Sequence, residues 1–255
     1  MNIDLKGRLA VVTGAGKGIG RAVALMLAEA GAKVAVNYFN SRREAEEVVK
    51  NIRNQGGEAE CFQADMTDTA QIEKLEKDVR GHFGEPVDIL INNAGHMLER
   101  RLNAEMTEQL YHQVMDLNVK STVFACKVFI PGMREKGGGH IVNMSSLAAH
   151  NGGGNGASIY AASKAAVIAY TKGLAKEAAA DGIIVNAVAP GFIGNTDFHS
   201  KLTSNEAREA TIQNVPLGRA GTPYDVAGAI LFLVSPICGY ITGETIEING
   251  GNYMK

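Results

Sequence analysis

Short apolar runs alternate with long helical patterns along all 255 residues of this chain. Several of the short runs are apolar at every position, which is typical of parallel strands covered on both faces. We expect strands at Leu9–Val12, Lys33–Asn37, Ala59–Gln63, Asp88–Ile91, His140–Met144, Ile183–Val188 and Thr245–Ile248. The helical patterns lie at Ile19–Ala30, Arg42–Asn54, Thr69–Phe83, Thr107–Met133, Ala157–Ala180 and Pro223–Leu233. This alternation predicts an α/β fold with one Rossmann-type, doubly wound parallel sheet of about seven strands and helices on both faces.

The same pattern favours a single domain over residues 1–255. The glycine-rich stretches at 137–139 and 152–156 flank one expected strand, so they indicate loops within a domain rather than boundaries. The polar run Asn195–Asn214 lacks a strand pattern. We expect a small helical lid over a substrate around residues 192–215.

Composition excludes several classes of partner. A net charge of −2 gives no basic surface for nucleic acid. The apolar run Ala227–Val234 is too short to cross a membrane, and the first ten residues lack the apolar core of a signal peptide. Cys61, Cys126 and Cys238 are odd in number and widely spaced, which fits a reducing compartment. We expect a cytoplasmic protein, and the histidine spacing predicts no metal site.

A glycine-rich turn, from Thr13 to Gly20, follows the first expected strand and opens the first expected helix. Glycines let the backbone approach a pyrophosphate, and the helix N-terminus supplies N–H groups and a partial positive charge. Such a turn also occurs at strand–helix junctions that bind nothing. The strand before it and the helix after it favour a dinucleotide site.

Tyr160 and Lys164 lie four residues apart in an Ala-rich stretch, so both side chains share one helical face. A free tyrosine titrates near pH 10, too high to exchange protons readily at neutral pH. An ammonium one turn away favours the phenolate, so we expect Lys164 to lower the pKa of Tyr160. The pair is a candidate general acid and base. The alternative is two solvated residues on an amphipathic helix.

Further motifs occur in a fixed order along the chain. They are the glycine turn, Asn92-Asn93-Ala94-Gly95, Asn118, Ser145-Ser146, the Tyr160–Lys164 pair and Pro190-Gly191. In this order, and in the Gly-x-x-x-Gly-x-Gly spacing of the turn, the chain resembles the short-chain dehydrogenase/reductase family over essentially its whole length.

The resemblance implies roles for four catalytic residues. Tyr160 would donate a proton to a carbonyl oxygen as hydride arrives at the carbon. Ser146 would donate a hydrogen bond to the same oxygen. Lys164 would hold the nicotinamide ribose, and Asn118 would link Lys164 through water to solvent. Family spacing selects Ser146, and Ser145 is the alternative.

The resemblance also implies a nicotinamide cofactor. The expected contacts are Gly14, Lys17, Gly18, Ile19, Gly20, Asn92, Ala94, Gly95, Tyr160, Lys164, Pro190, Gly191 and Ile193. Asp65 and Met66 match the position that contacts the adenine, although Asp65 could instead cap the helix near Thr69. One extra residue after Pro190-Gly191 makes Ile193 a safer contact than Thr196.

The end of the second strand bears on the choice of cofactor. An NAD-binding protein typically places an acid there, and this chain has Tyr38. Asn37 and Ser41 can donate hydrogen bonds, and Arg42 or Arg43 can pair with a 2′-phosphate. Lys17 adds a second positive charge. We therefore expect NADP(H) to be preferred over NAD(H). The alternative is that both arginines begin a solvated helix opposite Glu46 and Glu47.

The closing run Tyr240–Met254, which contains the last expected strand, resembles bacterial 3-oxoacyl-[acyl-carrier-protein] reductases. This implies NADPH-dependent reduction of a carbonyl to a secondary alcohol. The alternatives are a sugar, polyol or other small-alcohol dehydrogenase and a dinucleotide-sensing regulator, although regulators commonly lose the tyrosine or lysine. His150 and Asn155 could contact a hydroxylated substrate.

Acyl carrier protein is acidic, and Gly137 and Asp181 occupy places where its reductases tend to have basic residues. Arg134, Lys136 and Lys201 could compensate. The resemblance also implies a homotetramer.

Overall fold

The computed structural model describes residues 3–194 and 205–254. Within them, seven strands form one parallel sheet in the order β3-β2-β1-β4-β5-β6-β7. The strands are β1 (Leu9–Val12), β2 (Lys33–Tyr38), β3 (Ala59–Gln63), β4 (Ile89–Asn92), β5 (Gly139–Met144), β6 (Ile183–Pro190) and β7 (Thr245–Ile248). The expected α/β class and sheet are confirmed. The strand order reverses between β1 and β4, which opens a crevice at the carboxyl ends of the strands.

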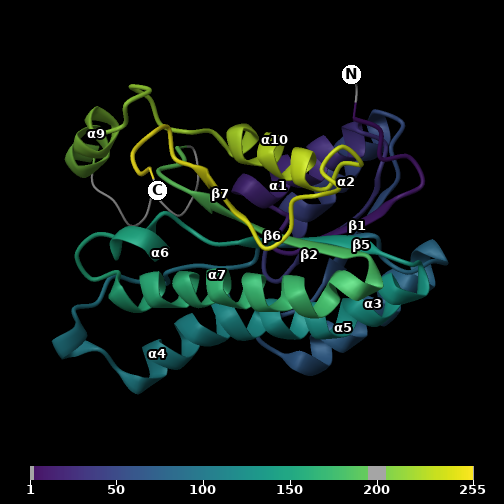
Figure 1. The fold of residues 1–255 in the computed structure, drawn as a ribbon, viewed down its shortest axis with the longest axis horizontal. Coiled ribbons are helices and arrows are strands. Elements are labelled where there is room, and N and C mark those ends of the chain that lie inside the picture. The colour runs from purple at the N-terminus through teal and green to yellow at the C-terminus, as the bar shows by residue number, and fades with distance from the viewer. Residues whose placement is uncertain (1–2, 195–204, 255) are drawn as a thin grey trace.

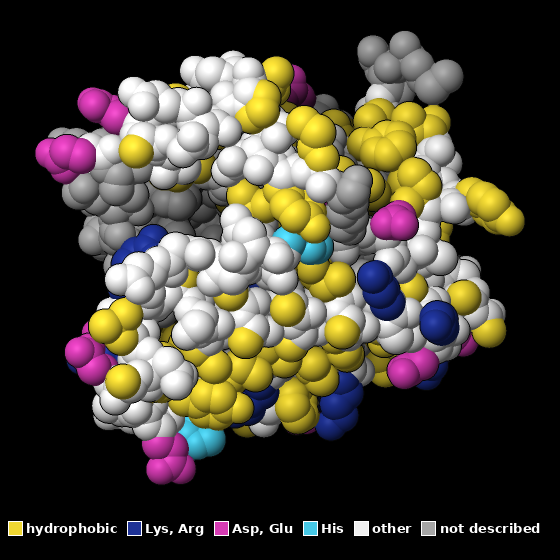
Figure 2. All heavy atoms as spheres, turned by 60° about the vertical axis from the view of Figure 1, so that its left-hand side comes forward, with side chains coloured by type: hydrophobic (Ala, Val, Ile, Leu, Met, Phe, Trp, Pro, Cys, Tyr) yellow, Lys and Arg dark blue, Asp and Glu magenta, His cyan; other side chains and the backbone are white. Residues whose placement is uncertain are grey.

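Helices cover both faces of the sheet (Figure 1). One layer holds α1 (Gly18–Glu29), α2 (Arg42–Asn54) and α10 (Pro223–Leu233). The other holds α3 (Thr69–Phe83), α4 (Glu108–Met115), α5 (Ser121–Glu135) and α7 (Ser158–Ala178). Figure 2 shows apolar side chains gathered over this second layer on the outside of the molecule.

Alternation along the strands divides the core in two. Ala10 and Val12 of β1 pack in the cluster beneath α1, α2 and α10. Leu9 and Val11 of the same strand pack in the cluster beneath α3, α5 and α7. Successive side chains of a strand point to opposite faces, so a strand between two helical layers must be apolar throughout.

The expected helix Thr107–Met133 is broken in the structure. A π-helical turn, η2 (Asp116–Lys120), joins α4 to α5 and carries Asn118. The Nδ2 of Asn118 donates to the Val114 carbonyl over 2.8 Å, which satisfies an acceptor inside the disturbed helix. Hydrophobic periodicity does not reveal such a turn, because one extra residue leaves the pattern on either side intact.

Shorter elements complete the chain. They are η1 (Asn103–Glu105), α6 (Ala148–Asn151), η3 (Ala179–Asp181) and α9 (Asn205–Gln213). Helix α9 falls inside the expected lid around residues 192–215, of which residues 195–204 lie outside the described residues. Thr196 and Lys201 are in this stretch.

Candidate active site

A cavity of about 340 Å³ opens at the carboxyl ends of the central strands, between the glycine turn and α7. Most of the expected cofactor contacts line it. These are Gly14, Lys17, Gly18, Ile19, Gly20, Ala94, Gly95, Tyr160, Lys164, Pro190, Gly191 and Ile193. Ser146 lines the same cavity, so the sequence motifs converge on one place.

The glycine turn has room only for glycine at its tightest points. Gly14 and Gly18 have φ angles of +62° and +53°, a region that other residues rarely adopt. A Cβ on Gly20 would lie 2.5 Å from both the Nδ2 of Asn93 and the Gly14 carbonyl oxygen. The Oδ1 of Asn37 accepts a 3.1 Å hydrogen bond from the Gly14 amide. Asn37 therefore shapes the turn from beneath.

Asn93 is a site residue that the sequence reasoning did not select. Its Nδ2 donates to the carbonyl oxygens of Thr13 and Gly14, over 2.8 and 3.1 Å, and it lines the cavity. The side chain of Asn92, which was expected there, lies inside the sheet and donates to Oδ1 of Asn143 over 2.8 Å. The side chains of Asn92 and Asn93 point to opposite sides, because successive residues of an extended chain alternate. The Asn-Asn-Ala-Gly motif alone does not say which of the two faces the cavity.

The residues at the end of β5 are tied to α7. The Nζ of Lys164, only 3% exposed, donates to the Met144 carbonyl over 2.9 Å. The Oγ of Ser145 donates to the Lys164 carbonyl over 2.8 Å. Ser146 instead forms a hydrogen bond with the hydroxyl of Tyr160. The structure thus gives the two serines different environments, and Ser146 is the one paired with the tyrosine.

Burial controls the protonation of the pair. It raises the pKa of Tyr160 to about 12, an effect that the Ser146 hydrogen bond opposes. Burial lowers the pKa of Lys164 to about 7. The Lys164 Nζ lies 5.8 Å from the centre of the Tyr160 ring. We expected Lys164 to lower the pKa of Tyr160, and the structure differs. The buried ammonium loses its own charge near neutral pH, so burial dominates both groups.

Asn118 holds the chain next to Lys164. Its side chain is fully buried, its Oδ1 accepts from the His96 amide over 3.1 Å, and its Nδ2 donates to the His96 carbonyl over 2.8 Å. A Cβ on Gly95 would lie 2.7 Å from this Oδ1 and 2.8 Å from the Nζ of Lys164. Asn118, Gly95 and Lys164 therefore form one close-packed unit.

His96 also lines the cavity, and no motif singled it out. Its Nδ1 accepts a 2.8 Å hydrogen bond from the Leu98 amide. Leu98 has a φ of +66°, the one positive value among the non-glycine residues that the structure describes. Its only sequence signal is its position directly after Asn-Asn-Ala-Gly.

The expected phosphate contacts near the end of β2 are engaged with acids. Arg42 and Arg43 lie 2.8 and 3.3 Å from glutamates one turn further along α2, as the solvated-helix alternative predicts. The Nζ of Lys17 lies 2.8 Å from Oε1 of Glu44, which holds the pKa of that carboxyl below its usual range. The positive charges of Lys17 and Arg42 lie near the glycine turn, but each is paired with a glutamate.

Tyr38, at the end of β2, is buried. Ser41 lies against the glycine turn, because a Cβ on Gly16 would come within 2.6 Å of its Oγ.

Asp65 and Met66 follow β3. The Oδ1 of Asp65 accepts from both the amide and the hydroxyl of Thr67, each over 2.8 Å. Asp68, not Asp65, caps α3, since its side chain accepts from the first amides of that helix. Met66 is buried. The capping alternative for Asp65 is wrong.

A second cavity of about 360 Å³ adjoins the first. The two share Ser146, Tyr160, Pro190 and Gly191. The second cavity is lined further by the 97–100 segment, by α6 and the loop after it, and by Asn252. Ser146 and Tyr160 thus stand at the junction of two spaces, and a cofactor and a substrate could meet there.

His150 and Asn155, the expected polar contacts, take other partners. The imidazole of His150 contacts Glu247 and Tyr253 near the C-terminus. The Asn155 carbonyl accepts a 3.0 Å hydrogen bond from Nη1 of Arg100, which does line the second cavity.

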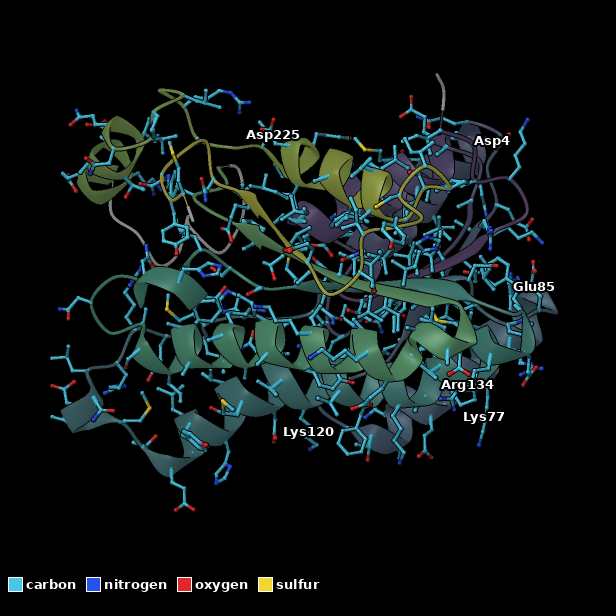
Figure 3. All side chains as sticks on the ribbon, viewed as in Figure 1. Asp4, Lys77, Glu85, Lys120, Arg134 and Asp225 are labelled. Atoms are coloured by element: carbon cyan, nitrogen blue, oxygen red, sulfur yellow. The ribbon has the colours of Figure 1, made fainter. Side chains whose placement is uncertain are left out.

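The basic residues expected to dock a carrier protein are paired with acids. Arg134 lies 2.6 Å from Asp181, and Lys136 lies 2.6 Å from Asp88 and 3.0 Å from Glu85. Figure 3 places Arg134 and Glu85 at the end of the molecule opposite α6 and α9. Within the chain, these charges lie far from the two cavities.

No group of three or more metal-ligating side chains was found among residues 3–194 and 205–254. Over the same residues, no helix is long and apolar enough to span a membrane.

Comparison with known proteins agrees with this geometry. The model of the family described as "Enoyl-(Acyl carrier protein) reductase" matches residues 14–252. The 3-oxoacyl-[acyl-carrier-protein] reductase FabG of Staphylococcus aureus is 42% identical over 245 residues, which cover 96% of this chain and 98% of that protein. The FabG protein of Vibrio cholerae is 41% identical over 252 residues, covering 99% of this chain and 100% of that protein.

Solved structures show the same relationship. A 7α-hydroxysteroid dehydrogenase complexed with NADH and 7-oxo glycochenodeoxycholic acid superposes with a TM-score of 0.94 at 34% identity, over 100% of this chain and 97% of that one. A dehydrogenase/reductase from Sinorhizobium meliloti 1021 superposes with a TM-score of 0.93, also at 34% identity, over 99% of this chain and 98% of that one. The chain belongs to the short-chain dehydrogenase/reductase family of oxidoreductases.

Proposed function

We propose that this protein is an NADPH-dependent carbonyl reductase acting on 3-oxoacyl thioesters, and that residues 1–255 work as one domain. The observation that carries the proposal is the position of Ser146 and Tyr160 at the junction of the two cavities, with the buried Lys164 beside them. Donors that are fixed before the reaction stabilise the charge that develops on a carbonyl oxygen.

The first cavity fits a dinucleotide. Its glycine turn excludes side chains at the N-terminus of α1, and the amino group of Lys164 lines its far side. Gly14, Lys17, Gly18, Ile19 and Gly20 would hold the pyrophosphate end. Ala94, Gly95, Pro190, Gly191 and Ile193 would hold the nicotinamide end. The nicotinamide supplies the hydride when it is bound.

The residues of this chain handle the proton. The substrate carbonyl gains a hydride at carbon and a proton at oxygen, and it becomes a secondary alcohol. Tyr160 gives that proton and becomes a phenolate, while Ser146 donates a hydrogen bond to the same oxygen. Lys164 stabilises the phenolate when it is protonated. Asn118 keeps the Gly95–His96 backbone beside Lys164, and water reached through this region returns the proton.

The preference for NADPH rests on the end of β2. An acid there would accept from the 2′-hydroxyl of NADH and would repel a 2′-phosphate, and this chain has Tyr38 instead. Lys17 and Arg42 supply positive charge nearby, with Ser41 as a further donor. The solved relative that contains NADH makes both cofactors necessary in the test.

The choice of a 3-oxoacyl thioester rests on the FabG relatives at 41–42% identity. Asn151 and Asn252 in the second cavity favour a second candidate, the reduction of a hydroxylated carbonyl such as a keto-sugar. The pairing of Arg134 and Lys136 with acids weighs against docking of a carrier protein at that end of the protomer.

Several properties complete the proposal. The protein works in the cytoplasm and assembles as a homotetramer. Exposed apolar residues on and after α10, such as Phe232, Ile237 and Tyr240, provide a surface for such contacts. A monomeric mass in light scattering would reject the tetramer.

The deciding experiment follows NADPH and NADH oxidation with short 3-oxoacyl thioesters and with keto-sugars. Fast turnover of the thioesters with NADPH supports the proposal, and turnover of the sugars alone supports the second candidate. Tyr160→Phe should lower kcat by about 10²–10⁴-fold and leave cofactor binding nearly unchanged. Tyr170→Phe removes a hydroxyl from the same helix away from the cavity and serves as the control. NADPH binding without any turnover would indicate a dinucleotide-sensing protein.

A further inference from the structure

His150, the third residue of α6, is held by two residues near the C-terminal end of the chain. Its Nε2 lies 2.8 Å from Oε1 of Glu247 on β7, and the two side chains are only 14% and 16% exposed. Its ring stacks on Tyr253, with ring centres 5.0 Å apart and planes inclined by 11°. In Figure 1 the C-terminal end lies directly beside α6. We call His150, Glu247 and Tyr253 the clasp.

Hydrogen bonds within the C-terminal turn hold Tyr253 in place independently of α6. The Oδ1 of Asn249 accepts from the amides of Gly251 and Tyr253, over 3.0 and 3.4 Å. The Nδ2 of Asn249 donates to the Tyr253 carbonyl over 3.1 Å. These bonds close residues 249–253 into a turn, and the turn presents the Tyr253 ring to His150 in one orientation.

Residues next to the clasp on both sides line the second cavity, although His150, Glu247 and Tyr253 themselves do not. Ser146 and Asn151 line it from the two ends of the α6 region, and Asn252 lines it from the C-terminal turn. Helix α6 is bound directly to Ser146, because the Ala149 amide donates to the Ser146 carbonyl over 2.9 Å and the Ala148 amide donates to its Oγ over 3.2 Å. A shift of α6 would therefore move Ser146 as well as the cavity wall.

We propose that His150 is a positioning residue which, through Glu247 and Tyr253, sets the width of the substrate cavity and the place of Ser146. The inference rests on the proposed function, in which the second cavity receives the carbonyl substrate. The sequence suggested that His150 touches the substrate. The clasp gives His150 an indirect role instead. By joining the α6 wall of the cavity to the wall formed by the C-terminal turn, His150 would select substrates by size.

The test compares His150→Ala and Tyr253→Ala with the control Tyr253→Phe, which keeps the stacked ring. Steady-state kinetics are measured on a series of 3-oxoacyl thioesters and cyclic ketones of increasing size. We expect both alanine variants to lower kcat/KM for the smallest substrates by about tenfold, because a displacement near 1 Å is costly in a reacting site. Larger substrates should lose less, so the size preference shifts upward. The control should match the parent protein.

Cofactor binding separates the clasp from general damage. The clasp residues lie outside the first cavity, so the NADPH Kd should change by less than about twofold in every variant. A size preference that is unchanged in both alanine variants would overturn the proposal, even if their thermal stability falls. Where an alanine variant does not fold, His150→Gln replaces it, since it keeps a polar side chain beside Glu247 but lacks the ring.

Amide hydrogen exchange tests the clasp without any turnover. His150→Ala should raise exchange in residues 147–152 and also in residues 249–254, whereas Tyr253→Phe should leave both unchanged. If the parent protein reduces no carbonyl compound, the proposed function fails and the exchange result still decides whether the clasp joins the two walls. Unchanged exchange in the C-terminal turn of His150→Ala would overturn the clasp itself.

Discussion

Ser145 and Lys164 are linked by a 2.8 Å hydrogen bond from the serine hydroxyl to the lysine carbonyl, beside the bond from Lys164 Nζ to Met144. Two hydrogen bonds therefore join the end of β5 to the first turns of α7, one donated by β5 and its extension and one donated by α7. Ser146 and Tyr160 are carried by these two elements, so their mutual position is fixed before any substrate arrives.

These hydrogen bonds predict that replacing Ser146 affects mainly kcat, whereas replacing Ser145 affects mainly stability. Ser146→Ala should lower kcat by about 10²-fold with little change in stability, because in the proposed function its hydroxyl donates to the substrate oxygen. Ser145→Ala should lower the free energy of unfolding by about 1 kcal/mol, because it removes a buried hydrogen bond between the end of β5 and α7. Steady-state kinetics and urea unfolding of both variants check this. A larger loss of kcat in Ser145→Ala would reverse the assignment.

Lys164 should make stability depend on pH. Its pKa falls from 10.5 to about 7 in the folded protein, so between these values the unfolded chain binds more protons and stability rises with pH. Below about pH 7 the folded protein carries a buried ammonium, which is costly. We expect Lys164→Met to raise the free energy of unfolding more at pH 6 than at pH 9, by about 2–3 kcal/mol.

Denaturant unfolding at the two pH values measures this difference. Lys172→Met, at an exposed position on the same helix, is the control and should show no such difference. Equal effects of Lys164→Met at both pH values would mean that the lysine keeps its charge when buried.

Glu44 should weaken the binding of NADPH. Its carboxylate lies 2.8 Å from Lys17 and competes with a 2′-phosphate for that charge. Both side chains are partly exposed, so the effect is modest and sensitive to salt. Glu44→Gln should tighten NADPH binding by about threefold and leave NADH unchanged, as measured by cofactor fluorescence. Glu47→Gln, which frees Arg43 instead, is the comparison, and an equal gain for NADH would refute the role of Lys17.

Gly95→Ala should abolish turnover. The added Cβ would lie within 2.8 Å of both Asn118 Oδ1 and Lys164 Nζ, closer than real contacts allow, so one of these groups must move. Gly81→Ala is the matched control, because the same change in α3 meets nothing within 4 Å and should stabilise the helix by about 0.5–1 kcal/mol. Activity and thermal unfolding of the two variants are compared. A normal kcat in Gly95→Ala would show that Asn118 or Lys164 can move without loss of activity.

The sequence predicted the layers of the fold well, because strands covered on both faces must be apolar throughout. Val34 and Val36 face one cluster and Ala35 the other, and all three are buried. The glycine turn and the Tyr160–Lys164 pair were also placed correctly in one cavity. In each case the signal is local in the sequence.

What the sequence missed depends on directions and distant contacts. Whether Asn92 or Asn93 faces the cavity depends on where β4 ends. The pairing of Lys17 with Glu44, and the role of His150, involve residues that lie far apart in the chain. The pKa values of Tyr160 and Lys164 follow from burial, which their spacing alone does not reveal.

The π-helical turn η2 has a consequence for one wall of the second cavity. Each residue advances a helix by about 100°, so the extra residue at 116–120 rotates everything before it by about that angle relative to α5. Restoring a regular helix there would swing α4 and the 97–106 segment around the axis, and would carry Met97 and Arg100 off the cavity that they line. The local winding of one helix therefore fixes the orientation of the 97–100 segment, which lines the second cavity.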